Sequence, residues 1–274
     1  MPWDELAPGC FRRRYAGPDE LDLNIGLVVG AAGVLLVDTG CGPGEAARLT
    51  DELRALGVER PRWVVNTHGH YDHCFGNAAF PEAEVHGHHR LAAYLAEHGE
   101  ANRAELAARS PAWAVEAAAV TLVAPGHPVH GVTTLDLGDR LVQLRALGPG
   151  HTAADLVVTV PDAGVVYAGD VLEESAPPAY GPDSYPLGWP DAVNTLLGLV
   201  PAGYRLVPGH GDVVDRDFAV RQWGALAEVA TELRRLHAAG VPVTEALAEG
   251  DWPYERPVLR EAVRRGYRQL TEQG

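Results

Sequence analysis

Short apolar runs alternate with longer amphipathic stretches along the chain. Residues 23–30 and 33–40 are two such runs around an Ala-Ala-Gly turn, and they predict a β-hairpin. Residues 42–57 begin with Gly and Pro and place apolar side chains at helical spacing, which is typical of an amphipathic helix. The run Arg62–His68 follows as a buried strand. The first part of the chain therefore predicts strands with a covering helix.

The rest of the chain repeats this alternation without a linker of low complexity. We predict strands at 83–88 and 204–210, hairpins at 133–147 and 155–170, and helices at 88–119 (with a break at Ser110-Pro111), 189–200, 218–237 and 257–270. Two similar halves, each with strands inside and helices outside, favour one domain over two independent domains. We expect a single domain over residues 1–274, with its core at 20–215 and a helical C-terminal extension at 216–274.

The charge balance excludes some classes of partner. The formal net charge is −15, and the chain contains arginine but no lysine. Because an acidic surface repels polyanions, we expect no nucleic acid and no anionic membrane as partner. Without lysine, neither a Schiff-base nucleophile nor a lysine anchor for a substrate is available.

The N-terminus and the cysteines bear on the compartment. The first residues lack a basic start followed by an apolar run, and no apolar stretch is long enough to span a bilayer. The three cysteines, Cys10, Cys41 and Cys74, are too few for a disulfide framework. We expect a cytoplasmic protein, although a mature form with its signal removed would have the same pattern.

Ionisable side chains are concentrated in the run NTHGHYDHCFGN, where six positions hold three histidines and an aspartate. On an extended segment His68 and His70 point the same way. Asp72 and His73 follow near the start of a predicted helix, where a carboxylate is favoured. Imidazole nitrogen and carboxylate oxygen suit zinc or a related first-row metal. Since one ion cannot easily use all four groups, the run favours two adjacent ions over a solvated polar loop.

Three later residues have the same setting. His151 in GPGHTAADL, Asp170 in VVYAGD and His210 in LVPGHGD each follow a predicted strand and stand beside small residues. Glycine neighbours let the backbone approach a crowded site. A single histidine of this kind is usually structural, but four strand ends that finish in His or Asp predict one shared site.

Taken in order, HGHYDH, GHT, GD and GHG resemble the metallo-β-lactamase superfamily, from Asp38 to His210. The resemblance implies an α+β fold, a four-layer αββα sandwich with its site at one edge between two sheets. It also implies two zinc ions, with iron or manganese as alternatives, and the following ligands: His68, His70 and His151 for the first ion, Asp72, His73 and His210 for the second, and Asp170 as a bridge. Asp38 resembles the buried aspartate that supports the metal loop from behind.

This ligand set predicts a dinuclear zinc hydrolase that acts on a small molecule. Two ions that share a water would lower its pKa and give hydroxide near neutral pH. We expect that hydroxide to attack the carbonyl of a thioester, lactone, ester or amide, with Asp72 orienting it and a metal ion stabilising the oxyanion.

Other activities remain open. A β-lactamase acting on antibiotics is the first alternative, although the chain has no export signal and no lysine to hold a substrate carboxylate. A mononuclear iron sulfur dioxygenase would need only His68, His70 or His151 and the bridging aspartate, and the full second set of ligands argues against it. Nuclease members would need a basic surface, and a non-catalytic binding protein would be expected to have lost a ligand.

Several other residues have two possible roles. In the Pro-rich segment Glu173–Pro190, the aromatic residues Tyr180, Tyr185 and Trp189 either form a substrate wall or cap the core. The histidines outside the motifs are interpreted as surface, helix-start or loop residues: His86, His88, His89, His127 and His130. The C-terminal helices could cover the sheet, shape the pocket or form a homodimer contact.

Overall fold

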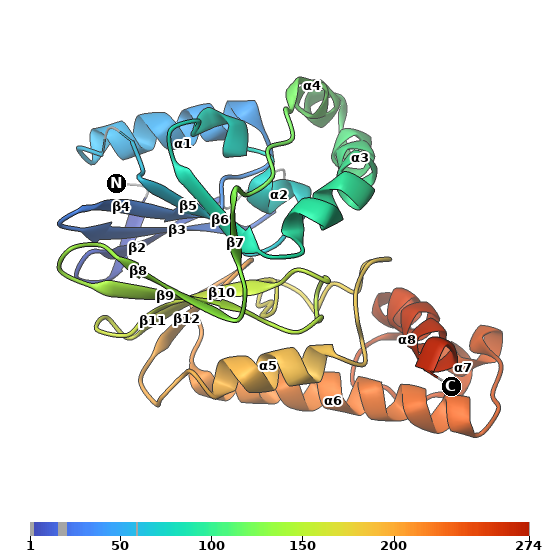
Figure 1. Ribbon diagram of the computed structural model, residues 1–274. Helices are drawn as coiled ribbons and strands as arrows, with labels where there is room; N and C mark the ends of the chain where they lie inside the picture. Colours follow the sequence, from blue (N-terminus) through green and yellow to red (C-terminus); the bar gives the residue numbers. More distant parts are fainter. Residues whose placement is uncertain (1–2, 16–20, 59, 274) are drawn as a thin grey trace.

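The computed structural model describes residues 3–15, 21–58 and 60–273, and these form a four-layer αββα sandwich (Figure 1). Two β-sheets pack face to face, α1 to α4 lie on the outer side of one sheet, and α5 and α6 lie beneath the other (Figure 1). The predicted fold class is therefore confirmed. The predicted domain bounds at residues 1, 20 and 274 lie outside the described residues.

The first sheet has seven strands in sequence order: β1 (Trp3–Ala7), β2 (Cys10–Tyr15), β3 (Leu23–Gly30), β4 (Gly33–Val37), β5 (Trp63–Val65), β6 (Glu84–His88) and β7 (His127–Val129). Pairing is antiparallel from β1 to β4 and parallel from β4 to β7. Parallel pairing brings the carboxyl ends of β4, β5 and β6 to one edge of the sheet, where the run NTHGHYDHCFGN begins.

The connections of this sheet form its helical layer: α1 (Pro43–Ala55), α2 (Tyr71–Cys74), the 3₁₀ turn η1 (Asn77–Ala79), α3 (Leu91–Arg109) and α4 (Pro111–Ala119). Helix α1 buries Ala46, Leu49 and Leu53, which recur at helical spacing and face the sheet. The break between α3 and α4 is at Ser110, whose hydroxyl accepts the Trp113 N–H and so caps α4 before its Pro111.

The second sheet has five strands in the order β12-β11-β10-β9-β8: β8 (Val132–Asp136), β9 (Leu141–Ala146), β10 (Leu156–Val160), β11 (Val165–Gly169) and β12 (Arg205–Pro208). Strands β10 and β11 are buried at every position, because sheet covers one face and helix the other. The covering helices are α5 (Trp189–Leu197) and α6 (Arg216–Ala238).

The C-terminal extension continues through α7 (Val243–Glu249), the 3₁₀ turn η2 (Arg256–Leu259) and α8 (Arg260–Gln273). Helix α8 packs on α6, and its Arg265 donates to the Ser184 carbonyl at 2.9 Å while lying over the Tyr185 ring. The extension therefore holds the segment 173–188 in addition to covering the sheet. Among the helices of the described residues, none combines the length and apolarity needed to cross a membrane.

The interior between the sheets depends on one close approach. Tyr167 of β11 is buried, and its hydroxyl donates to the carbonyl of Phe11 at 2.9 Å. The ring lies against Gly26 of β3, where a Cβ atom would come within 2.5 Å of it. Only glycine allows the two sheets to approach so closely at this point.

Most elements lie where the sequence predicts them, but three strands were missed. Strands β1 and β2 precede the predicted core boundary at residue 20 and belong to the same sheet. Strand β7 contains His127, which the sequence analysis wrongly assigned to a polar loop. His86 and His88 were likewise wrongly interpreted as surface or helix-start residues, because both are buried in β6.

The Gly26 contact yields a stability prediction. Gly26→Ala should lower the free energy of unfolding by about 1–3 kcal/mol, because the hydrogen-bonded Tyr167 ring cannot move aside. Chemical unfolding of the metal-free protein measures this. Gly224→Ala in α6 is the control: nothing lies within 4 Å of the added Cβ, so it should stabilise the helix by up to about 1 kcal/mol. Equal effects of the two substitutions would contradict the packing argument.

Candidate metal centre

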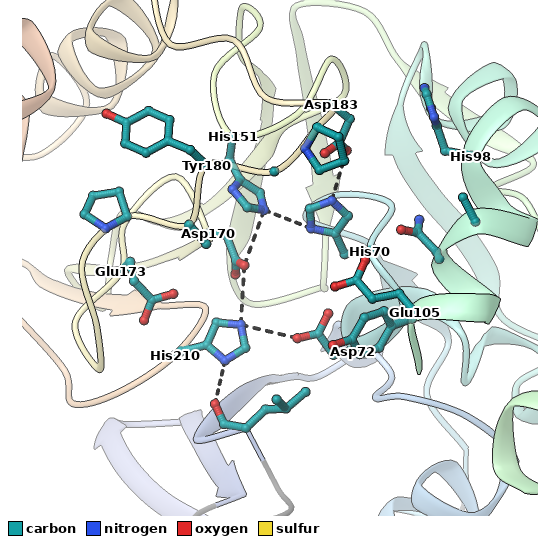
Figure 2. A pocket seen from close by; sticks show the side chains of 18 of the residues that line it. His70, Asp72, His98, Glu105, His151, Asp170, Glu173, Tyr180, Asp183 and His210 are labelled. Carbon is teal, nitrogen blue, oxygen red and sulfur yellow. Dashed lines mark hydrogen bonds and ion pairs between the residues drawn. The ribbon is translucent and has the colours of Figure 1, made fainter. Parts of the chain in front are cut away.

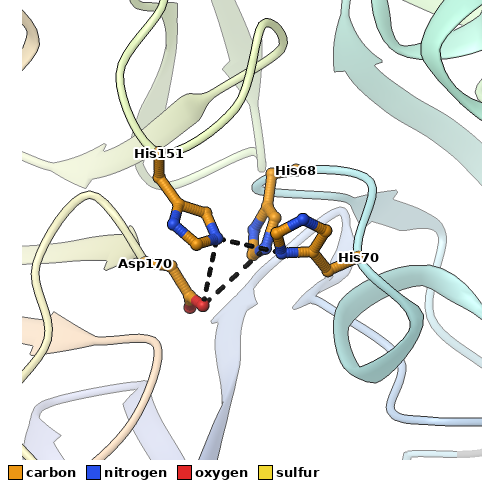
Figure 3. A group of neighbouring side chains, drawn as sticks. All are labelled: His68, His70, His151 and Asp170. Atoms are coloured by element: carbon orange, nitrogen blue, oxygen red, sulfur yellow. Dashed lines mark hydrogen bonds and ion pairs between the residues drawn. The ribbon is translucent and has the colours of Figure 1, made fainter. Parts of the chain in front are cut away.

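The ends of strands from both sheets bring the predicted ligands together. The ligand atoms of His68, His70, His151 and Asp170 lie within 4.8 Å of one another (Figure 3). Those of Asp72, His73 and His210 form a second group under the same limit. The structure thus gathers the residues into the two groups that the resemblance implies, while their role as ligands stays a prediction.

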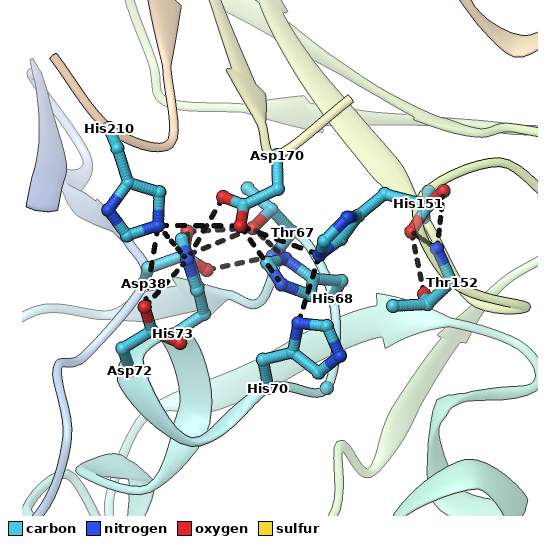
Figure 4. Close-up of polar contacts among 12 residues, drawn as sticks. Asp38, Thr67, His68, His70, Asp72, His73, His151, Thr152, Asp170 and His210 are labelled. Atoms are coloured by element: carbon cyan, nitrogen blue, oxygen red, sulfur yellow. Dashed lines mark hydrogen bonds and ion pairs between the residues drawn. The ribbon is translucent and has the colours of Figure 1, made fainter. Parts of the chain in front are cut away.

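Asp170 lies between the two groups (Figure 4). Its Oδ1 is 3.1 Å from His73 Nε2, and its Oδ2 is 3.3 Å from His210 Nε2 and 3.4 Å from His151 Nε2. Burial alone would raise the pKa of Asp170, but the imidazoles of His210, His73 and His68 outweigh it and hold the pKa well below its usual range. A carboxylate in this position can contact a cation in each group.

Asp38 fixes the predicted metal-binding run, residues 66–77, from behind. Its carboxylate accepts the Thr67 N–H at 2.8 Å and the Thr67 hydroxyl at 2.7 Å, and it lies 2.8 Å from His73 Nδ1. Asp38 itself has φ 66°, a left-handed conformation that costs energy in a residue other than glycine. Its backbone strain is therefore tied to the orientation of His73, as expected for the residue behind the metal loop.

An amide network holds the same run from its other side. Asn66 Nδ2 donates to Asn77 Oδ1 at 3.0 Å, and Asn77 Nδ2 donates to Asn66 Oδ1 at 2.8 Å and to the Val123 carbonyl at 2.9 Å. Both asparagines are buried. The two ends of NTHGHYDHCFGN are thus joined, which holds the histidines between them in a compact turn.

The His210 loop is held by the opposite sheet. The Asn24 side chain of β3 donates to the carbonyls of Pro208 and Gly211, and His210 Nδ1 donates to the Leu21 carbonyl at 2.8 Å. Burial would lower the pKa of His210, but Asp170 and Asp72 raise it to about 10. Gly209 is needed for close approach, because a Cβ there would lie 1.8 Å from Asp170 Oδ1.

Asp183 is a residue of the site that the sequence analysis missed. Its carboxylate lies 3.0 Å from His70 Nε2 and accepts the Tyr94 hydroxyl at 2.7 Å. Burial would lower the pKa of His70, but Asp183 outweighs it and raises the pKa to about 9. His70 Nδ1 faces His151 Nε2 at 2.9 Å, so Asp183 orients the ring with Nδ1 toward the first group. Only the fold places Asp183 here, 113 residues after His70.

His68 and His151 are kept neutral by their surroundings. Burial lowers the pKa of His151 to about 4, and burial together with His73 lowers that of His68 well below its usual value. The turn that carries His151 is closed by Asp155, which accepts the Thr152 N–H at 3.0 Å and the Thr152 hydroxyl at 2.6 Å. Neutral imidazoles are the form that binds metal.

The donor set fits metal ions. His68 Nε2 is buried without a hydrogen-bond partner among the described residues, and the nitrogens of His73 and His210 face each other at 3.4 Å. A buried polar atom without a partner is costly, and a cation shared by these nitrogens and the carboxylates removes that cost. Imidazole and carboxylate ligands together suit zinc and neighbouring first-row ions.

A cavity of about 560 Å³ opens beside the two groups (Figure 2). Its wall is built from the metal-binding run, from α3, from the segment 175–183 and from Val258 of the C-terminal extension. Tyr180 lines the cavity and also packs in the core, whereas Tyr185 and Trp189 do not belong to the wall. Trp189 is fully buried in the core, where it packs edge-on against His151 and donates to the Val171 carbonyl. Tyr185 instead contacts Arg265.

The cavity wall is acidic beyond the predicted ligands. Glu105 of α3 points into the space between His70 and Asp72, and Glu173 lies on the opposite side beside His210 (Figure 2). Burial and the neighbouring Asp170 raise the pKa of Glu173 to about 7. Among the described residues that line the cavity there is no arginine. An anionic substituent held against this wall would therefore have no arginine to pair with in the described residues.

Comparison with known families agrees with this geometry. The family model described as "Metallo-beta-lactamase superfamily" matches residues 18–211, which include all the predicted ligands. The chain is also 28% identical over 202 residues to an acyl-coenzyme A thioesterase, MBLAC2, from Gallus gallus, covering 68% of this chain and 72% of that protein.

Solved structures share the fold. A metallo-beta-lactamase from Pontibacter korlensis superposes with a TM-score of 0.68 at 20% identity, covering 82% of this chain and 98% of that one. The inverting sec-alkylsulfatase Pisa1 from Pseudomonas sp. gives a TM-score of 0.75 at 17% identity, covering 97% of this chain and 50% of that one. At these identities the likeness concerns the fold alone.

The contact between Asp183 and His70 predicts an effect on metal affinity. Asp183→Asn keeps the shape of the side chain but removes the charge that orients His70, so zinc affinity should fall by about 10- to 100-fold. Competition with a chromophoric chelator measures it. Asp191→Asn, at an exposed position in the first turn of α5, should leave affinity unchanged. Equal affinities of the two variants would refute the role given to Asp183.

Proposed function

The chain belongs to the metallo-β-lactamase superfamily and is a metal-dependent hydrolase, and we propose that it uses two zinc ions to hydrolyse the carbonyl of a small-molecule thioester, lactone, ester or amide. The observation that carries this proposal is the pairing of two ligand groups around Asp170, next to a cavity of about 560 Å³. A cavity of this size accommodates a metabolite.

In this proposal His68, His70 and His151 hold one ion and Asp72, His73 and His210 hold the other, with Asp170 between them. The chemistry that bound zinc supplies is a lowered pKa of coordinated water and polarisation of a carbonyl oxygen. The protein supplies the orientation: Asp38 fixes His73, Asp183 fixes His70, and the Leu21 carbonyl fixes His210.

Asp72 has the position of a group that orients the nucleophile. Its carboxylate faces the cavity at the start of α2 and lies 3.4 Å from His210 Nε2. A carboxylate so placed can accept a hydrogen bond from a reacting water and take up its proton. The segment 175–183, which contains Pro177, Pro178 and Pro182, forms one side of the cavity beside these groups.

We favour a thioester or another neutral acyl compound over a β-lactam, because of the charge of the cavity wall. The thioesterase relative supports a thioester as the reacting bond, whereas the acidic wall favours a thiol part without the phosphates of coenzyme A. A β-lactam carries a carboxylate, and the described wall offers Glu105 and Glu173 but no arginine to meet it. The β-lactamase reading remains the alternative. Because the second ligand group is also assembled, a mononuclear iron dioxygenase is less well supported. We also propose that the partner is a small molecule and not a nucleic acid.

The first test is a hydrolysis panel with zinc-loaded protein. We expect turnover of an acyl-thioester, a lactone or an aryl ester, no turnover of an aryl phosphodiester, and loss of activity by at least about 10³-fold in His68→Ala, because a buried ligand is removed. Metal analysis of the protein as purified accompanies it. Near-stoichiometric iron, or rapid His68-dependent opening of a cephalosporin alone, would replace the proposal with one of its two alternatives.

The acidic wall predicts a preference for substrate charge. Three thioesters of one acyl group with an ammonium, a neutral or a carboxylate thiol should show kcat/KM falling in that order, by about five- to tenfold for each unit of charge. Glu105→Gln should flatten the series. Glu100 lies on the same helix, is exposed and pairs with Arg103. Glu100→Gln is therefore the control and should leave the series unchanged. Turnover independent of charge would contradict the preference without touching the hydrolase assignment.

A further inference from the structure

Ligand-type side chains also meet at the edge of the seven-stranded sheet, outside the two groups of the candidate metal centre. Glu84 and His86 are two apart on β6 and therefore point to the same face. His127 of the edge strand β7 pairs with His86 in the parallel ladder. The fold thus brings Glu84 and His86 together with His127, which follows Glu84 by 43 positions in the sequence.

The geometry of these three residues is compatible with a metal site. One ligand atom from each of Glu84, His86 and His127 lies within 4.8 Å of the others. His86 Nε2 is 3.8 Å from Glu84 Oε2, and the two imidazole rings are 4.8 Å apart between centroids, tilted by 33°. Small side-chain rotations would bring all three to one ion.

His86 supplies the independent sign that a ligand belongs here. The residue is 6% exposed, and its Nε2 has no hydrogen-bond partner among the described residues. A buried nitrogen without a partner is costly to the folded state. Burial and the neighbouring His127 also keep the ring neutral, since they lower its pKa to about 4. A neutral, buried imidazole with a free nitrogen is ready to bind a metal ion, and exposed His127 and half-exposed Glu84 leave a path for it to enter.

The other histidines nearby show the contrast. His88, two residues further along β6, donates from Nε2 to the Leu147 carbonyl at 3.2 Å and accepts the Arg90 N–H at Nδ1. Both of its nitrogens are satisfied, so it needs no ion. His89 and His130 stack on each other at 4.7 Å, but neither belongs to the group. The three-residue group is therefore a specific feature of a histidine-rich edge.

We propose that Glu84, His86 and His127 bind a further divalent first-row transition-metal ion, of the zinc type, that ties β7 to β6. Two imidazoles and a carboxylate are a common ligand set for such ions, with open positions left to water. Strand β7 has three residues and, in the described part of the chain, pairs only with β6. The segment before it is hydrogen-bonded to Asn77 through the Val123 carbonyl, so the ion would steady a contact of the metal-binding run.

Zinc stoichiometry tests this proposal without reference to activity. Equilibrium dialysis of the full chain against excess zinc, followed by metal analysis, should give one ion more per chain for the wild type than for His127→Ala. Excess zinc should also raise the thermal midpoint of unfolding, and this rise should be larger for the wild type than for His127→Ala. Glu84→Gln should lower the affinity for the additional ion by about tenfold. His130→Ala, a neighbouring exposed histidine outside the group, should bind as the wild type does.

Equal zinc content in the wild type and His127→Ala would overturn the proposal, as would loss of the additional ion in His130→Ala. His127 is exposed, so its replacement should not impair folding, and circular dichroism of each variant verifies this. Hydrolysis measured on the same samples keeps the outcome separate from the proposed function. The candidate metal centre shares no residue with this group, so its activity should survive in His127→Ala.

Discussion

The meeting of Asp170 with histidines from both sheets is the interaction on which the rest of the site depends. Asp170 follows β11 of the second sheet, whereas His68 and His73 follow β5 of the first. So many buried titratable groups destabilise the folded state when no cations lie between them. Hydrogen bonds at the strand ends therefore hold the predicted ligands in place. They come from the strained Asp38, from the paired amides of Asn66 and Asn77, and from the contact of Asn24 with the His210 loop.

The sequence revealed the parts of the site that are local in the chain. His68, His70, Asp72 and His73 fall within six positions, and His151, Asp170 and His210 each close an apolar run, so pattern and spacing were sufficient to predict that they lie together. Asp183 carries no such signal, because it sits in a Pro-rich segment and meets His70 only through the fold. The roles of Tyr185 and Trp189 were left open for a related reason: an aromatic residue in a loop does not reveal which side of the loop it faces.

The histidine-rich edge shows the same limit more sharply. His86, His88 and His89 form one cluster in the sequence, yet each has a different environment: free nitrogen, satisfied nitrogens and ring stacking. The environment of His86 depends on the neighbouring parallel strand β7, which has three residues and is too short to be predicted from its own pattern. Long-range strand pairing therefore decides chemistry that local sequence leaves open.

The way each predicted histidine ligand is oriented divides the site into rigid and adaptable parts. His73, His210 and His70 each have the nitrogen that faces away from the group held by an oxygen: Asp38, the Leu21 carbonyl and Asp183. His151 differs, because its Nδ1 has no hydrogen-bond partner in the described residues and its ring is positioned by packing on Trp189. Packing fixes a ring plane less strictly than a hydrogen bond fixes a tautomer. His151 also faces the cavity, so the least constrained ligand is one that a substrate can contact.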